Sequence, residues 1–154
     1  MIGNKGAAYI ADALKVNHSL ENLVLVSNEI SAHGAMELGA ALEKNTTLAQ
    51  LILDNNYLRN EGVKYLCDAL RTNTTLHSLS LAGCWVNDEA SFNISNMMKN
   101  NQTLAVLCLD ENTDIKMEGV KYLADGLKEN YGLNTLDLAS TIISDENTAA
   151  DLAA

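Results

Sequence analysis

An eleven-residue pattern recurs at a nearly fixed interval and constrains the fold of this chain more than any other feature. Its clearest copy, residues 48–58, reads L-x-x-L-x-L-x-x-N-x-L. The first leucine recurs at spacings of 28, 28, 28 and 29 residues, at Leu20, Leu48, Leu76, Leu104 and Leu133. A fixed period of this length is typical of proteins in which each repeat forms one supersecondary unit. The sequence therefore predicts a stack of units, each covering the apolar flank of the one before.

The residues between successive copies of the pattern have the periodicity of an amphipathic helix. In the third unit, small or apolar residues recur four positions apart at Gly62, Leu66 and Leu70. The same spacing in the other units predicts helices over residues 4–16, 32–44, 60–72, 88–99 and 117–129. A small residue in the first turn would let the helix backbone approach the neighbouring unit. An Asn ends each helix, at Asn17, Asn45, Asn73, Asn101 and Asn130. We expect this Asn to adopt the left-handed conformation that terminates helices.

Short parallel strands are predicted within the repeated pattern itself, over residues 22–25, 50–53, 78–81, 106–109 and 135–138. The second and third leucines of each copy point inward, because side chains alternate along a strand. The ninth position of the pattern holds Asn28, Asn56, Cys84, Asn112 and Thr141. An inward Asn there can bond to backbone groups on both sides, whereas Cys and Thr do so more weakly. This position predicts a structural ladder and not a catalytic site.

Two regions depart from the regular pattern. In the fourth unit Asp114 delays the apolar Ile115 by one position, and we expect the extra residue to bulge in the turn 111–115. Residues 144–154 form a degenerate partial repeat or tail. We interpret the chain as one domain of residues 1–154, a fragment of a longer array, with repeats starting near residues 2, 30, 58, 86 and 115. Its uncapped ends would expose apolar surface and strand edges through which copies could self-associate.

Composition limits the classes of partner and compartment. Asp and Glu number 20 against 10 Lys and Arg, so the formal net charge is −10. This balance argues against binding to nucleic acid or an anionic membrane, which require clustered cations, and suits a protein partner with a basic surface. Three cysteines without a C-x-x-C pair indicate a reducing compartment. No signal-like apolar core opens the chain, and no run approaches the roughly 20 apolar residues of a membrane span. We therefore expect a cytoplasmic protein.

The units resemble the ribonuclease-inhibitor-like class of leucine-rich repeats. They follow the form G-x-x-x-L-x-x-x-L-x-x-N-x-x-L-x-x-L-x-L-x-x-[NC]-x-[LIV], as in residues 62–86, and the resemblance covers residues 2–143. It implies an α/β fold, a right-handed α/β horseshoe of about five repeats with a parallel concave sheet and convex helices. Family members include ribonuclease inhibitor, the sensing segments of NOD-like receptors, tropomodulin-type actin-binding ends and Ran GTPase-activating proteins. That range of roles means that the fold does not by itself give the function.

The concave face is expected to display the residues between and after the strand leucines, and it is our first candidate for a binding surface. The candidate residues on it are Val24, Val26, Gln50, Ile52, Asp54, Ser78, Ser80, Val106, Cys108, Asp110, Thr135 and Asp137. This surface is partly apolar and acidic, and it contains no cation. In one interpretation a partner presents a basic or mixed element to it; in the other it is only the solvated face of a generic stack.

A second row of candidates follows the ninth position of the pattern and includes Tyr57 and Trp85, which should be adjacent because they lie one repeat apart. Exposed Trp and Tyr are typical anchors of protein interfaces. Alternatively, the two rings shield the edge of the loops by packing on each other and on the next repeat. Both interpretations stay open at this point.

No motif for metal binding, phosphate binding, nucleophilic catalysis or acid–base catalysis is present, so we expect no enzyme activity and no cofactor. Cys108 should face the groove, but the pattern places no His near it. Three functional hypotheses follow. The chain is a protein-binding scaffold, or a regulator of a small GTPase resembling Ran GTPase-activating protein, or a structural module that self-associates.

Overall fold

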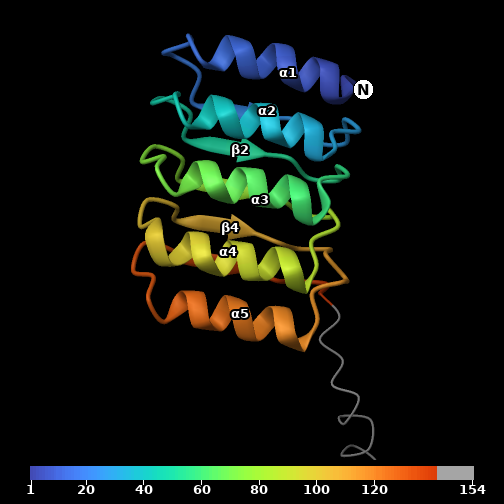
Figure 1. Cartoon of the computed structure of the whole chain (residues 1–154), viewed down its shortest axis with the longest axis vertical. Helices are drawn as coiled ribbons and strands as arrows, with labels where there is room; N and C mark the ends of the chain where they lie inside the picture. The colour runs from blue at the N-terminus through green and yellow to red at the C-terminus, as the bar shows by residue number, and fades with distance from the viewer. Residues whose placement is uncertain (142–154) are drawn as a thin grey trace, which may run out of the picture.

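Helices and strands alternate five times along residues 1–141, the part of the chain that the computed structural model describes (Figure 1). The helices are α1 (Gly3–Leu14), α2 (Ala32–Leu42), α3 (Arg59–Leu70), α4 (Asp88–Asn100) and α5 (Met117–Leu127). The strands are β1 (Asn22–Val24), β2 (Gln50–Ile52), β3 (Ser78–Ser80), β4 (Val106–Cys108) and β5 (Thr135–Asp137). The helices lie side by side in chain order as one layer, and the strands form the other (Figure 1). The prediction for residues 144–154 lies outside the described residues.

The strands form one parallel sheet in the order β1-β2-β3-β4-β5. Leu51 pairs with Leu79 and Leu79 with Leu107, so leucine stands opposite leucine across the sheet. This register follows from the repeat length, because equal spacing along the chain places equivalent residues side by side. Among the described helices, none is long and apolar enough to cross a membrane.

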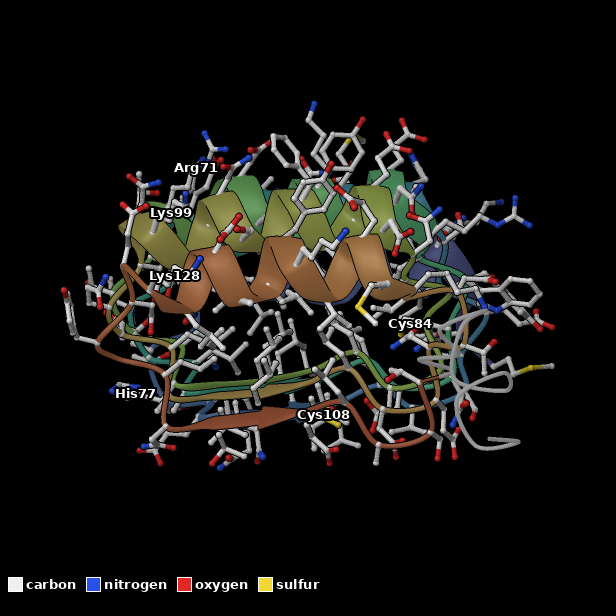
Figure 2. All side chains as sticks on the ribbon, turned by 90° about the horizontal axis from the view of Figure 1, so that it is seen from below. Arg71, His77, Cys84, Lys99, Cys108 and Lys128 are labelled. Atoms are coloured by element: carbon white, nitrogen blue, oxygen red, sulfur yellow. The ribbon has the colours of Figure 1, made fainter. Side chains whose placement is uncertain are left out.

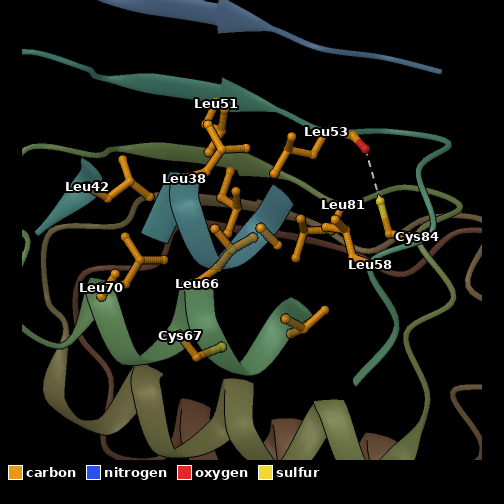
Figure 3. Packing of buried hydrophobic residues seen from close by; sticks show 14 of the residues in the cluster. Leu38, Leu42, Leu51, Leu53, Leu58, Leu66, Cys67, Leu70, Leu81 and Cys84 are labelled. Carbon is orange, nitrogen blue, oxygen red and sulfur yellow. Dashed lines mark hydrogen bonds between the residues drawn. The ribbon is translucent and has the colours of Figure 1, made fainter. Parts of the chain in front are cut away.

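The hydrophobic core lies between the two layers. Leu38 and Leu66 point from α2 and α3 toward Leu51, Leu53 and Leu81, which come from the sheet side (Figure 3). These side chains are almost fully buried, and burying one leucine contributes about 1.5–3 kcal/mol. The inward position of the second and third leucines is thus confirmed in the interior units.

Small residues in the first helical turns let neighbouring helices approach closely, as predicted. A Cβ atom added at Gly62 would lie 3.2 Å from the Cα of Ala32 and 3.3 Å from the Cβ of Ala35, both in the preceding helix. At Gly34 it would lie 2.8 Å from Asn4 Oδ1. A larger side chain at either glycine would therefore push adjacent units apart.

The predicted left-handed conformation of the helix-ending asparagines is wrong, because none of them has a positive φ. Their side chains bridge units instead. Asn73 Nδ2 donates to the carbonyl oxygens of Leu42, at 2.8 Å, and Asn45, at 3.3 Å. Its Oδ1 accepts from the backbone N–H groups of Thr75 and Leu76. Asn45, Asn101 and Asn130 make the same kinds of bond. The physical reason is that the turn leaves backbone groups buried, and only a bridging amide satisfies both units at once.

The ladder at the ninth position of the pattern is confirmed. Asn56 Oδ1 accepts from the N–H groups of Asn28 and Ile30 in the preceding unit, and its Nδ2 donates to the carbonyls of Leu25 and Leu53. Cys84 makes one contact of this kind, from its Sγ to the Leu53 carbonyl at 3.1 Å (Figure 3). The thiol thus replaces the amide only in part, as expected for a weak donor.

This difference coincides with a difference in the preceding turn. The first and third units, which are followed by Asn56 and Asn112, share a turn in which Glu29 or Trp85 has a positive φ. The second unit, followed by Cys84, does not share it, and Arg59 has the positive φ there instead. We infer that the Asn Oδ1 of the next unit selects the shared turn by accepting its N–H groups.

The extra residue of the fourth unit is accommodated in its turn. Ser31 bridges to Tyr57 between the first and second units, a separation of 26 residues, whereas the Asn87–Asp114 bridge spans 27. Ile115 is fully buried despite its delay by one position. The predicted irregular turn is therefore present, and the core beneath it is not interrupted.

Candidate functional site

The side of the sheet away from the helices displays the residues predicted for the binding surface. Strand pairing aligns them in two rows across the sheet, and a third row follows two positions after the second. The rows are Asn22, Gln50, Ser78, Val106, Thr135; Val24, Ile52, Ser80, Cys108, Asp137; and Val26, Asp54, Ala82, Asp110, Ala139. All these residues are exposed or half-buried. The structure thus brings the predicted residues together, and we call this surface the strand face.

The chemistry of the strand face changes along the stack. In the first two units Val24, 59% exposed, and Ile52 supply apolar surface, with the carboxylate of Asp54 beyond them. Serines occupy the third unit, and carboxylates recur at Asp110 and Asp137. A partner lying across the sheet would therefore meet most of the apolar contact in the first two units and negative charge at three of the five units.

Backbone and hydroxyl groups orient the carboxylates of the strand face. One oxygen of Asp54 accepts a 2.5 Å bond from Ser80 Oγ and a 3.0 Å bond from the N–H of Ala82, both in the next unit. Asp110 and Asp137 accept from the N–H groups of Glu111 and Ala139. Each of these bonds uses Oδ1, and Oδ2 of Asp137 lies 3.9 Å from the Cys108 thiol.

The three cysteines lie in different surroundings. Burial raises the pKa of the Cys67 and Cys84 thiols to about 12, so both are protonated and unreactive at neutral pH. Cys108 is half-buried on the strand face, with its Sγ 3.9 Å from Asp137 Oδ2. The neighbour of this thiol is thus a carboxylate, which does not favour the reactive thiolate form.

Tyr57 and Trp85 are adjacent, as the repeat spacing predicted. Their ring centroids are 6.4 Å apart with an angle of 59° between planes. The Arg59 guanidinium lies over the Trp85 ring, 5.9 Å from its centroid. Yet the residues remain 50% and 55% exposed. The pair therefore packs on itself and still offers aromatic surface to a partner, so the two interpretations are not exclusive.

The charges of the described chain are segregated between its two sides. The strands and the turns around them hold seven Asp and Glu residues and no Lys or Arg, within residues 20–31, 48–58, 76–87, 104–115 and 133–141. The rest of residues 1–141, which includes every described helix, holds ten acids and ten cations. Figure 2 shows Arg71, Lys99 and Lys128 on the helix side, and His77 and Cys108 on the strand side.

Ion pairs on the helix side use many of those charges. Lys15–Asp12, Lys121–Glu118 and Lys128–Asp125 are pairs three residues apart on one helix surface, with N–O distances of 2.8, 3.2 and 2.7 Å. Such exposed pairs contribute little stability. They nevertheless neutralise the helix side, so the negative field of the described chain belongs to the strand side.

Sequence reasoning missed three charged residues at the edge of the turns: Arg59, Glu111 and Asp114. Counting charges separately for strand segments and helical segments would have found the two acids. The contact of Arg59 with Trp85 joins residues 26 positions apart, and the repeat pattern assigns no partner to that position.

Comparison with known proteins agrees with the repeat architecture. Residues 16–39, 44–67 and 72–90 match the family model described as Leucine Rich repeat. These segments are leucine-rich repeats. No curated protein matches the chain. The parallel strands and packed helices form an α/β repeat solenoid.

Two solved structures resemble this chain. The tropomodulin C-terminal domain of Caenorhabditis elegans has a TM-score of 0.77 and 13% identity, and the match covers 93% of this chain and 87% of that one. The structure described as leiomodin-1 actin-binding site 2 has a TM-score of 0.65 and 22% identity, covering 82% and 75%. At these identities the likeness shows a shared fold.

Proposed function

We propose that this chain is a non-enzymatic protein-binding scaffold that holds a basic partner surface against its strand face and the adjoining turns. The observation that carries this proposal is the segregation of charge, with seven acids and no Lys or Arg in the strand segments. A one-sided negative field orients an approaching basic protein and accelerates its capture. The same field repels nucleic acid, so nucleic acid is not the partner that we propose.

The form of the surface supports the same conclusion. Parallel strands present their side chains in straight rows, which suits an extended protein element better than a small molecule. The apolar residues Val24 and Ile52 supply contact area, and Asp110 and Asp137 supply charge. We further assign the chain to the ribonuclease-inhibitor-like class, with the strands on the concave face of a horseshoe and the protein in the cytoplasm. Full helices of 11 to 13 residues in units of 28 or 29 support this class.

The decisive experiment compares two variants with the same net charge. The strand-face triple changes Asp54, Asp110 and Asp137 to Asn, which keeps each Oδ1 acceptor and removes the charge. The helix-side triple changes Asp12, Asp68 and Asp125 to Asn. The probe is a fluorescently labelled, lysine-rich peptide, whose binding is followed by anisotropy at low and at moderate salt.

We expect the strand-face triple to bind the peptide at least about tenfold more weakly than the unmodified chain does, the equivalent of roughly 1.4 kcal/mol. We expect the helix-side triple to bind the peptide as tightly as the unmodified chain. Equal loss in both variants would mean that only net charge matters, and would overturn the assignment of the site. Because one of the two similar structures is described as an actin-binding site, actin is the first folded protein to test, by cosedimentation with the same variants.

Self-association is a second candidate function, and it is supported by exposed apolar side chains in the first unit. Tyr9 and Val16 are 76% and 74% exposed. In the same unit a hollow of about 120 Å³ is lined by Ile10, Ala13, Leu14, Asn17 and Leu20. A second copy of the chain could cover this hollow. Sedimentation over a range of concentrations tests this, since a mass that stays monomeric throughout excludes it.

A further inference from the structure

A hollow of about 210 Å³ lies between the turns that follow β3 and β4. It is lined by Trp85 and Gly83 on one side and by Glu111, Thr113 and Asp114 on the other. A water molecule occupies roughly 30 Å³ of liquid, so the space accommodates a long side chain. An exposed aromatic ring and two carboxylates thus share one small opening at the edge of the strand face.

The absence of a side chain at Gly83 keeps this hollow open. The equivalent residues Ser27, Asn55, Glu111 and Ser140 share its left-handed conformation, with φ between 54° and 59°. Glycine is therefore not needed here for the backbone conformation. A Cβ at Gly83 would lie 2.5 Å from Asn55 Oδ1, so the Asn55 side chain would have to move aside. It would also lie 3.6 Å from Glu111 Oε2, so a side chain here would reach the carboxylate that lines the hollow.

The fourth unit supplies the acidic wall through its extra residue. Asp114 occupies the position that delays Ile115, and it forms the bridge to Asn87. Within residues 1–141, no Lys or Arg nitrogen lies within 4.0 Å of a carboxylate oxygen of Glu111 or Asp114. The nearby Lys116 donates instead to the Thr113 carbonyl, at 2.6 Å. Neither carboxylate is therefore held in an ion pair within this part of the chain, although the Lys116 ammonium lies on the same turn.

Trp85 supplies the other wall, and the structure already shows what its ring attracts. On the side of the second unit, the ring receives the Arg59 guanidinium at 5.9 Å. On the side of the fourth unit, it lines the hollow. A cation over a Trp ring is stabilised by the ring quadrupole, and a carboxylate beside it adds a charge-assisted hydrogen bond.

We propose that this hollow is an anchor pocket for a single lysine or arginine side chain of the protein partner. The aliphatic stem of that side chain packs on Trp85, and its cationic end is held by Glu111 and Asp114. This inference rests on the proposed function, because it names the one partner residue that fixes a basic element on the strand face. An acidic or purely apolar side chain would leave the two carboxylates unpaired.

Trp85 is the only Trp, so its fluorescence reports directly on the pocket. The lysine-rich peptide is titrated into the full chain, with a second peptide in which every lysine is glutamine. Two readouts are recorded: peptide anisotropy for binding anywhere, and Trp85 emission with its quenching by acrylamide for binding in the pocket. We expect a saturable change in Trp85 emission, and protection from acrylamide, with the lysine peptide alone.

Two variants separate the charge of the pocket from its shape. The double variant Glu111→Gln, Asp114→Asn removes the charge and should weaken binding about tenfold while abolishing the emission change. Gly83→Asn keeps the net charge and uses the residue found at the equivalent Asn55, but it fills the hollow and should abolish the emission change too. The control, Glu118→Gln with Asp125→Asn on α5, changes the charge equally and should bind normally. Thermal melting of each variant verifies that it is folded.

The outcomes distinguish the pocket from the wider proposal. One outcome is that the peptide binds by anisotropy, that the strand-face triple loses this binding, and that Trp85 emission does not change and the pocket variants bind normally. The anchor pocket is then wrong, and the proposed scaffold function is retained. If the lysine peptide does not bind at all, both are overturned. Binding of both peptides with equal emission changes would show an apolar groove without charge selection, and would also overturn the anchor.

Discussion

The two edges of the sheet, at opposite ends of every strand, are built differently. At the edge where helices lead into strands, Asn45, Asn73, Asn101 and Asn130 repeat one hydrogen-bonding arrangement. At the edge where strands lead into helices, Cys84 interrupts the asparagine ladder. That second edge also contains the extra residue, the aromatic pair and the unpaired acids.

The difference teaches where this solenoid tolerates variation. The first edge contains backbone groups of two neighbouring units that one Asn amide bridges, so a change there affects two units at once. The second edge is exposed to solvent beside the strand face. Its turns differ in conformation from one unit to another, yet the apolar residues beneath them are buried in each case. We interpret the first edge as the one that maintains the stack and the second as the one that provides the binding surface.

The largest expected effect on stability is at the first edge, where helices lead into strands. Asn73→Ala removes the bonds to the carbonyls of Leu42 and Asn45 and to the N–H groups of Thr75 and Leu76, of which the Asn45 carbonyl keeps a second donor in the Thr75 hydroxyl. At about 1–3 kcal/mol for each unsatisfied group, with partial relief from water, we expect a loss of about 2–5 kcal/mol in the free energy of unfolding. Urea denaturation measures it. A loss under about 1 kcal/mol would contradict the contrast between the edges.

The two buried thiols should make the stability of the fold decrease at alkaline pH. The pKa values of Cys67 and Cys84 rise from 9.0 to about 12 on folding, because burial disfavours the thiolate. Above pH 9.0 the unfolded chain releases thiol protons that the folded chain retains, so stability is complete below that pH and falls as the pH approaches 12. The double variant Cys67→Ala, Cys84→Ala should lose less stability over this range. Denaturation midpoints of both proteins, measured at matched pH values, test this difference.

A gain of stability is expected at the second edge when the asparagine missing from its ladder is restored at position 84. Cys84→Asn offers an Oδ1 to the turn of the second unit, as Asn56 does to the turn of the first. We expect about 1 kcal/mol of added stability from the restored bonds. The turn should then resemble those of the first and third units, which would move Arg59 relative to Trp85 and alter the Trp85 emission. Unchanged emission together with unchanged stability would show that the amide does not select the turn.

The smallest effect on stability is expected on the strand face itself. The strand-face triple, with Asp54, Asp110 and Asp137 changed to Asn, keeps the hydrogen bonds through Oδ1. Its free energy of unfolding should therefore stay within about 0.5 kcal/mol of that of the unmodified chain. Differential scanning calorimetry checks this. A much larger loss would mean that these carboxylates maintain the stack and are not available to a partner.

Much of the fold was predictable because it is local and repeated. The spacing of the leucines predicted the strand register, and the four-residue spacing from Gly62 to Leu70 predicted the helix between strands. The helix ends were less accurate: α3 ends at Leu70, two residues before its predicted end, because the last turn unwinds toward Asn73. The role of that Asn was also misjudged, since its partners lie in the preceding unit as well as its own.

The candidate site was predictable in part. Alternation along the strands placed Val24, Ile52 and Asp137 on one face correctly, because the side chains of a strand can take only two directions. The anchor pocket was not predictable, because it depends on how two irregular turns meet. The left-handed Gly83 and the extra residue at Asp114 are individually visible in the sequence, but not the space between them.

The sequence by itself determined the period, the parallel order of the units and the residues that each unit buries, because these depend on patterns repeated every 28 or 29 positions. Only the tertiary structure decided which polar groups satisfy one another across units, and how charge is divided between the two sides. Those features arise from contacts between residues 26 to 32 positions apart, whose energies depend on distances that no single unit contains.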